Sequence, residues 1–314
     1  MEIAQELARI KPKKDTVFTI GVFDGVHLGH QSLLTCLTDK ARKNGWLSGV
    51  ITFKSHPETV LASTSQLPWL DDIDNRIEQI KSLGIDIVVT LSFTPELRQL
   101  SAEDFVQLLQ KHLKLRGLII GPDFALGKNR QGTAQQLRAL GQKMGFSVAV
   151  VPPLVIDGEV VSSSLIRQLL ARGDTKKAAN LLGRPFSISG LVVPGDQRGR
   201  ELGFPTANLE IRPDQAAPGD GVYVTLAYTD DKPLPSVTNI GVRPTFGGGK
   251  RLIETYIIDH KAQLPGKKLR IEFIDKLRGE KKFRSADELK AQIARDVEQA
   301  KQILGKAIPK SKPA

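Results

Sequence analysis

The stretch GVFDGVHLGH, residues 21 to 30, decides the fold of the first half of this 314-residue chain. It leaves an apolar run, TVFTIGVF (Thr16 to Phe23), and enters an amphipathic one, SLLTCLTDKA (Ser32 to Ala41). Glycine permits backbone angles and close approaches that a Cβ atom would forbid, and the stretch holds Gly21, Gly25 and Gly29. The pattern predicts a β-strand, a loop of a size that suits a phosphate group, and the start of a helix.

Two histidines in this loop indicate what it binds. The backbone amides that open a helix lack partners within the helix and carry partial positive charge, so an anion is favoured there. His27 and His30 can both face a phosphate group as it gains charge in a transition state, and one such donor contributes about 3 to 4 kcal/mol. Two histidines that only cap the helix are the alternative, but the adjoining strand, helix and glycines favour a phosphate site.

The string HLGH resembles the HxGH signature of the nucleotidylyltransferase superfamily, and the longer GVFDGVHLGH is similar to the form found in prokaryotic FAD synthetases. The resemblance implies attack on the α-phosphate of ATP with release of pyrophosphate. It also implies that His27 and His30 are catalytic and that Gly25 and Gly29 bind phosphate.

Composition limits the class of protein. Hydrophobic residues make up 40% of the chain and charged residues 25%, as in ordinary soluble proteins, and the length suits two domains. No signal peptide and no apolar run of about 20 residues is evident, and a single cysteine excludes an internal disulfide. We therefore expect a cytoplasmic protein without a membrane partner.

The remaining histidines and the cysteine lack metal-ligand spacing: His56, His112, His260 and Cys36. The sequence does not indicate an oligomeric state.

The net charge of +11 is concentrated at one end of the chain, because residues 246–314 hold 17 Lys and Arg against 9 Asp and Glu. The basic residues alternate with acidic ones, and aromatic residues, which would stack on single strands, make up 5% of the chain. A solvated surface that steers anionic nucleotides is favoured over nucleic-acid binding.

Apolar runs alternate with helical patterns from residue 16 to about residue 151, and this alternation predicts a parallel sheet covered by helices on both faces. The expected strands are 16–22, 48–53, 85–91, 118–120 and 147–151. The expected helices are 31–44, 72–83, 101–113 and 133–144. Ligands bind at the carboxyl ends of the strands in such a sheet, which is where the HLGH loop falls.

Two later segments belong to the same edge. The loop GPDFALGKNRQGT, residues 121–133, resembles the family's GxDFxFG loop along the nucleotide and flavin phosphate, with Asp123 available for polar contacts and Leu126 in place of an aromatic residue. VSSSLIRQLL, residues 161–170, resembles the family's ISSTxxR. Its hydroxyls and guanidinium are expected to bind ATP phosphates; they belong to Ser162, Ser163, Ser164 and Arg167. Simple capping and a plain connecting loop are the alternatives.

The pattern changes near Phe186 to short strands with turns, which predicts a small antiparallel barrel followed by one helix. The expected strands are 187–193, 221–229, 234–240, 252–259 and 268–276. Ser285 and Glu288 mark the start of the helix. The chain thus divides into a Rossmann-like nucleotidylyltransferase domain (1–186), a barrel domain (187–305) and a basic tail (306–314) expected to be disordered.

The run PGDQRGRELGFPTANLEI, residues 194–211, suits a second phosphate site, because its glycines let the backbone close over phosphates. Thr206 and Asn208 offer the hard oxygen ligands that Mg²⁺ prefers. No P-loop string is present. RGRELGFPTAN resembles the riboflavin kinase signature, with Pro194 where that family often has histidine. The resemblance implies ATP and flavin binding by residues of this run: Gly195, Arg198, Gly199, Gly203, Thr206 and Asn208.

TNIGVRPTFGGG (238–249) and RLIETYIIDH (251–260) are similar to later kinase elements. Arg243 is expected at the ATP or flavin site. Glu254 stands at the family's catalytic glutamate, where a carboxylate can accept the proton of the riboflavin 5′-hydroxyl. Tyr256 stands where the family commonly has histidine.

Both motif sets in one chain resemble bacterial bifunctional riboflavin kinase and FAD synthetase. The resemblance implies a transferase that uses ATP and Mg²⁺ to convert riboflavin to FMN and FMN to FAD. One alternative is another HxGH nucleotidylyltransferase, such as a relative of class I aminoacyl-tRNA synthetases, with a basic RNA-binding appendage. Another is a flavin or RNA sensor without catalysis.

Overall fold

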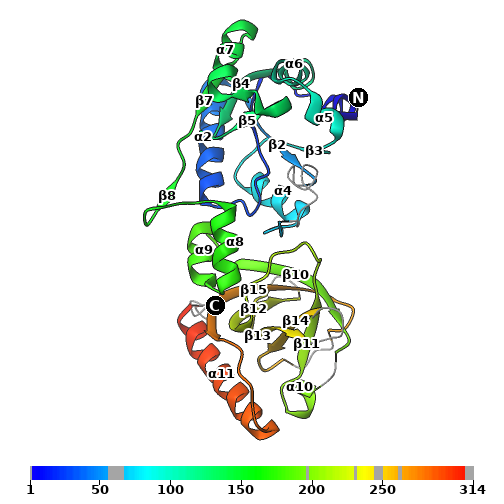
Figure 1. Cartoon of the computed structure of the whole chain (residues 1–314), viewed down its shortest axis with the longest axis vertical. Coiled ribbons are helices and arrows are strands. Elements are labelled where there is room, and N and C mark those ends of the chain that lie inside the picture. The colour runs from blue at the N-terminus through cyan, green and yellow to red at the C-terminus, as the bar shows by residue number, and fades with distance from the viewer. Residues whose placement is uncertain are drawn as a thin grey trace, which may run out of the picture. The chain divides into compact units, whose positions relative to one another are not determined.

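The computed structural model describes residues 2–55, 67–195, 198–229, 232–243, 250–260 and 264–307. The chain divides into two compact units, Met1–Ser163 and Ser164–Ala314 (Figure 1). Among the described helices, none is both long and apolar enough to span a membrane.

A parallel sheet of five strands forms the first unit, in the order β3-β2-β1-β4-β7. The strands are β1 (Thr16–Ile20), β2 (Leu47–Phe53), β3 (Ile87–Leu91), β4 (Leu115–Ile120) and β7 (Ser147–Val150). All four pairings are parallel, so the predicted sheet is confirmed. The strand order reverses between β1 and β4, and a crevice for ligands forms at the carboxyl ends of such a pair.

Helices cover both faces of this sheet. They are α1 (Glu2–Ala8), α2 (Leu28–Asn44), α4 (Ile73–Ser82), α5 (Pro95–Gln99), α6 (Ala102–Leu113) and α7 (Ala134–Met144). Phe18 and Ile51 belong to the core cluster that includes residues of α1, α6 and α7. Val17 and Val50 belong to the cluster with α2 and α4. Successive side chains of a strand point to opposite faces, so adjacent residues enter different cores.

Side-chain caps set where these helices begin. Ser101 accepts the backbone N–H of Asp104 and Thr133 that of Gln136, which confirms two of the predicted starts. The helix expected from residue 31 begins at Leu28, because His27 caps it. The short helices α1 and α5 are not predicted from the sequence. The unit also contains two small hairpins and a turn: β5 (Ala125–Leu126), η1 (Lys128–Arg130), β6 (Gly132–Thr133), β8 (Val155–Ile156) and β9 (Glu159–Val160).

A closed antiparallel barrel forms the second unit, in the order β10-β11-β14-β13-β12-β15. The strands are β10 (Phe186–Val193), β11 (Thr206–Glu210), β12 (Gly221–Tyr228), β13 (Leu234–Arg243), β14 (Lys250–Ile257) and β15 (Lys268–Arg278). The predicted barrel is confirmed, with one strand more than expected. The additional strand is β11, which falls within the run 194–211 that is predicted as a loop, because its alternation is short and follows a glycine-rich segment.

Among the described residues, four helices accompany the barrel: α8 (Ser163–Arg172), α9 (Thr175–Leu182), α10 (Arg198–Glu201) and α11 (Ala286–Ala307). Ser285 Oγ accepts the N–H of Glu288 at 3.2 Å, as predicted for the start of α11. Ala300 and Leu304 of α11 pack with Val222 and Val224 of β12. Residues 308–314 of the predicted tail lie outside the described residues.

Helices α8 and α9 pack on the barrel. The Gly219 N–H donates to the Leu170 carbonyl at 2.8 Å, and Lys176 pairs with Asp275 at 2.7 Å. The two helices therefore group with the second unit, whereas the sequence places them before the boundary at 186/187. That boundary stays a prediction.

A chain of buried hydroxyls joins β12, β13 and β14 of the barrel, and it supports a prediction. Thr225 Oγ1 lies 2.8 Å from both Ser236 Oγ and Thr238 Oγ1, and the latter lies 3.0 Å from Thr255 Oγ1. Thr225→Val leaves neighbouring hydroxyls short of a partner, so we expect a loss of about 1–3 kcal/mol in the free energy of unfolding of the barrel. Calorimetry measures this loss. Thr35→Val, at an exposed position, is the control, and its free energy of unfolding should stay within about 0.5 kcal/mol of the wild-type value. A similarly small effect of Thr225→Val would contradict the prediction.

Candidate active sites

The loop between β1 and α2 has a constrained backbone. The Gly21 N–H donates to the Ile51 carbonyl at 3.0 Å, which ties the start of the loop to β2. Phe23, Gly25 and Val26 all have positive φ, at 53°, 79° and 36°. Such angles cost free energy in residues other than glycine and persist only where the surroundings enforce them. The loop is therefore held in one shape.

The two histidines of the loop lie against each other. Their rings stack with centroids 3.6 Å apart and an interplanar angle of 17°. The His30 N–H donates to His27 Nδ1 at 3.3 Å, so this nitrogen carries no proton and the neutral His27 ring carries its proton on Nε2. Phe23 packs edge-on against His30 with centroids 5.1 Å apart. The predicted pair is thus brought together at the start of α2.

Burial lowers the pKa of His30 well below its usual value, and the electrostatic interactions with His27 and Arg76 act in the same direction. The imidazole is therefore neutral at pH 7. Its Nδ1 is buried without a hydrogen-bond partner among the described residues.

This lowered pKa makes the stability of the sheet unit depend on pH. The unfolded chain, in which histidine titrates near pH 6.5, binds more protons than the folded chain below that pH, so stability falls as the pH drops below about 6.5. His30→Asn removes this titration, and we expect a shallower loss of stability between about pH 6.5 and 5. Urea unfolding at a series of pH values measures it. Thr35→Val removes no titrating group and should keep the wild-type slope, and an unchanged slope for His30→Asn would contradict the prediction.

Local contacts explain two of the residues predicted for this site, Gly29 by close packing and Ser163 by a hydrogen bond. A Cβ atom at Gly29 would lie 3.2 Å from the His27 ring and 3.2 Å from the Val161 carbonyl. Ser163 Oγ donates to the Asp24 carbonyl at 2.9 Å. Ser163 therefore anchors the histidine loop.

A pocket of about 360 Å³ opens beside the loop and is lined mainly by apolar and aromatic side chains. Gly21 and Val22 form part of its wall, and Asn129 and Arg130 of the 121–133 loop form another part. The aromatic lining comes from four separate segments: Phe53, Phe93, Phe105 and Phe124. The pocket is not predictable from the sequence, because no local pattern joins these residues.

The other residues predicted for the first site lie on other segments of the chain. Asp123 is exposed, and its carbonyl accepts a hydrogen bond from Arg130 Nη2 at 2.9 Å. Ser164 is exposed and Arg167 is half-buried, both on α8 of the second unit. Ser162 is half-buried in the first unit. His56 lies outside the described residues.

In the barrel, the glycines of the 194–211 run lie close to the predicted ligands. A Cβ at Gly195 would lie 1.9 Å from Asn208 Nδ2, and one at Gly199 would lie 2.5 Å from the Phe204 carbonyl. Gly203 has a φ of 87°. A Cβ at Gly195 or Gly199 would force the neighbouring atoms to move, whereas at Gly203 the positive φ alone favours glycine.

Strand pairing places the polar residues of the barrel on one face. Asn208 of β11 lies directly opposite Glu254 of β14, and Asn239 of β13 lies opposite Glu254 on its other side. Thr206 lies opposite Tyr256 in the next outward-facing row, and Phe204 packs edge-on against Tyr256. Directly opposed residues project to the same face of a sheet with Cβ atoms about 5 Å apart. The register therefore brings together Thr206, Asn208 and Glu254.

Asn239 is a polar residue of this face that the sequence analysis did not select. Its alternation with the buried Thr238 and Ile240 is the signal that could have found it. The structure does not describe the side chains of Arg198 and Arg243.

Among the described residues, no group of three or more His, Cys, Asp or Glu side chains could hold a metal ion. A hydroxyl and an amide oxygen, from Thr206 and Asn208, share one face with the Glu254 carboxylate. This donor set fits Mg²⁺, which keeps several waters and binds substrate phosphates.

Comparison with known proteins agrees with this architecture. The family model for FAD synthetase matches residues 9–165, and that for riboflavin kinase matches residues 182–304. The chain is 38% identical over 300 residues to the bifunctional riboflavin kinase/FMN adenylyltransferase of Escherichia coli K12, covering 95% of this chain and 96% of the relative. It is 36% identical over 306 residues to that of Pseudomonas fluorescens, covering 96% and 98%.

The crystal structure of a macrolide-efflux protein from Streptococcus pneumoniae has the same fold, with a TM-score of 0.88 and 30% identity over 94% of this chain and 96% of that one. The matched domains occur in the order of the two structural units and span almost the full length of the relatives. The chain therefore belongs to the family of bifunctional riboflavin kinases/FMN adenylyltransferases.

Proposed function

We propose that this chain makes FMN from riboflavin on the outer face of the barrel and FAD from FMN at the carboxyl edge of the sheet. The observation that carries the proposal is the pair of separate polar sites. One is the stacked His27 and His30 beside an aromatic pocket, and the other is the facing Asn208 and Glu254.

In the sheet unit, the aromatic pocket suits the flat, apolar isoalloxazine ring of FMN, because its size and lining are those of small-molecule sites. An FMN phosphate oxygen attacks the α-phosphorus of ATP, the bond to the β-phosphate breaks, and pyrophosphate leaves. Proton-bearing ring nitrogens of His27 and His30 stabilise the charge that develops on the phosphates. Phosphate binding is completed by the residues assigned from the sequence: Gly25, Gly29, Asp123, Ser162, Ser163, Ser164 and Arg167.

In the barrel, the Glu254 carboxylate orients the riboflavin 5′-hydroxyl and accepts its proton as the γ-phosphoryl group of ATP transfers. Gly195, Gly199 and Gly203 let the backbone approach the phosphates, and Arg198 and Arg243 pair with them. Thr206 and Asn208 would hold Mg²⁺, which neutralises charge on the phosphates when bound.

The basic region that suggested an RNA-binding appendage forms β14, β15 and α11 of the barrel unit. The match to the riboflavin kinase model covers it to residue 304, so no separate appendage is needed to explain the charge.

Incubation with riboflavin, ATP and Mg²⁺, followed by chromatography, tests the proposal. We expect FMN and then FAD, with pyrophosphate released in step with FAD. If neither flavin product forms, the proposal is wrong.

A further inference from the structure

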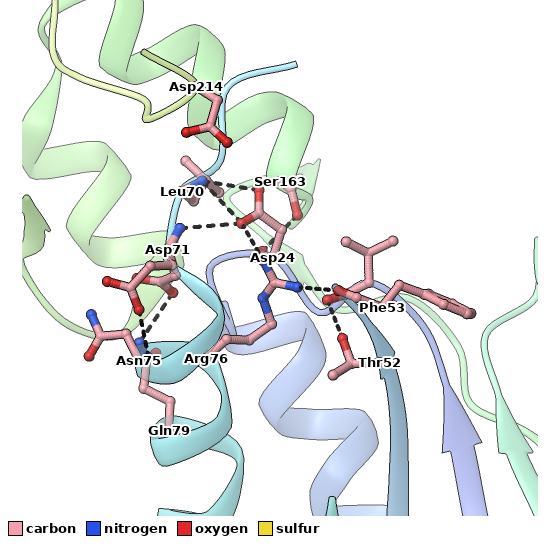
Figure 2. Close-up of polar contacts among 12 residues, drawn as sticks. Asp24, Thr52, Phe53, Leu70, Asp71, Asn75, Arg76, Gln79, Ser163 and Asp214 are labelled. Atoms are coloured by element: carbon pink, nitrogen blue, oxygen red, sulfur yellow. Dashed lines mark hydrogen bonds and ion pairs between the residues drawn. The ribbon is translucent and has the colours of Figure 1, made fainter. Parts of the chain in front are cut away.

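A buried carboxylate lies inside the histidine loop and takes no part in the mechanism described above. The Asp24 side chain is 2% exposed. Its two oxygens accept the Leu70 N–H at 3.0 and 3.1 Å, and one of them accepts the Asp71 N–H at 3.3 Å (Figure 2). Asp24 thus ties the loop to the segment that precedes α4.

A buried arginine on α4 completes this connection. Arg76 is 1% exposed. Its Nη1 donates to the Phe53 carbonyl at 3.3 Å, and its Nη2 lies 3.8 Å from Asp24 Oδ1. The guanidinium also lies over the Trp69 ring, 4.3 Å from its centroid. Figure 2 shows Arg76 between Asp24 and Phe53.

Two of the segments that these contacts join carry part of the proposed adenylyltransferase site. Asp24 lies in the loop that presents His27 and His30, and Phe53 lines the aromatic pocket. Thr52 Oγ1 donates to the Val22 carbonyl at 2.9 Å, which adds a second link between the end of β2 and the loop. The polar contacts therefore fix the phosphate-binding loop relative to the pocket wall.

The energetic cost of burying the Asp24–Arg76 ion pair argues against a role in stability alone. Burial of two charges costs several kcal/mol each before pairing, and apolar replacements of such pairs are often as stable. A charged pair in this position instead holds the positive-φ backbone of the loop in one shape, since each charge reaches a backbone group of another segment.

We propose that Asp24 and Arg76 are positioning residues for adenylyl transfer, which hold the histidine loop against the Phe53 wall so that ATP and flavin are aligned. The inference rests on the proposed function of the sheet unit. Neither residue needs to touch substrate. Their loss should therefore lower kcat for FAD formation, the step that depends on the exact position of the histidines, more than it raises KM.

The test compares Arg76→Met and Asp24→Asn with wild type in the full chain. We expect kcat for FAD formation from added FMN to fall about 10- to 100-fold, with KM for FMN and ATP within about threefold of wild type. Arg76→Lys keeps the positive charge but not the planar guanidinium group with its several N–H donors. This variant should therefore be faster than Arg76→Met and slower than wild type. FMN formation from riboflavin by the same preparations should be unchanged and shows that the protein is intact.

Asp86→Asn is the matched control. The Asp86 carboxylate also ties two segments, because it accepts the Ser48 N–H and hydroxyl at 2.8 and 2.7 Å. Asp86 directly precedes β3 and therefore lies at the amino ends of the strands, whereas the histidine loop lies at their carboxyl ends. This variant should lose stability and keep kcat.

The inference is overturned if Asp24→Asn and Arg76→Lys keep the wild-type kcat and KM, or if their rates fall only as far as that of Asp86→Asn at equal stability. If Arg76→Met does not fold, Asp24→Asn and Arg76→Lys alone test the positioning role. A wild-type chain that makes no FAD would instead overturn the proposed function.

Discussion

Replacing His30 by alanine is expected to lower the rate of FAD formation from FMN by about 100- to 1000-fold. The His30 ring stacks on His27 at the start of α2, beside the pocket proposed for the flavin. Its loss removes one donor that stabilises the phosphates as charge develops on them, and it leaves the backbone amides of the helix start in place. The rate is measured with FMN, ATP and Mg²⁺ by chromatography of FAD.

The same preparation should phosphorylate riboflavin at the wild-type rate, because the residues proposed for the kinase site lie on the barrel. His112→Ala changes a histidine on α6 that lies outside the pocket, and it should leave both rates unchanged. Undiminished FAD formation by His30→Ala would show that the histidine loop is not the adenylyltransferase site.

Replacing Asn208 by alanine is expected to lower the rate of FMN formation from riboflavin by about 100-fold or more, while added FMN is still converted to FAD. Asn208 lies directly opposite Glu254 and against the backbone of Gly195. The substitution removes an oxygen proposed to hold Mg²⁺ and leaves the Glu254 carboxylate without its neighbour. Glu254→Gln should have a similar effect, since an amide cannot accept the proton of the 5′-hydroxyl.

The measurement follows both products separately, one assay starting from riboflavin and one from FMN. Gln299→Ala, on an exposed part of α11, serves as the control in the same unit. Loss of both activities in folded Asn208→Ala would contradict two separate sites, and an unchanged rate of FMN formation would remove Asn208 from the kinase site.

The two sites differ in how their parts are assembled. In the sheet unit, the histidines come from one short loop, and the loop is held by residues distant in sequence such as Arg76 and Ser163. In the barrel, Asn208 and Glu254 come from separate strands and meet only because β11 pairs with β14 in one register. A shift of that register by one residue would move Glu254 to the other face.

The sequence by itself determined the parallel sheet, the barrel, the start of α11 and the pairing of His27 with His30, because each depends on local patterns of apolar residues, caps and glycines. Tertiary structure alone decided the aromatic pocket, the buried Asp24 and Arg76 pair, and the row that joins Asn208, Glu254 and Asn239. These features bring together segments far apart in the chain. Strand order and register, which set those distances, follow from the packing of the whole unit and leave no local mark in the sequence.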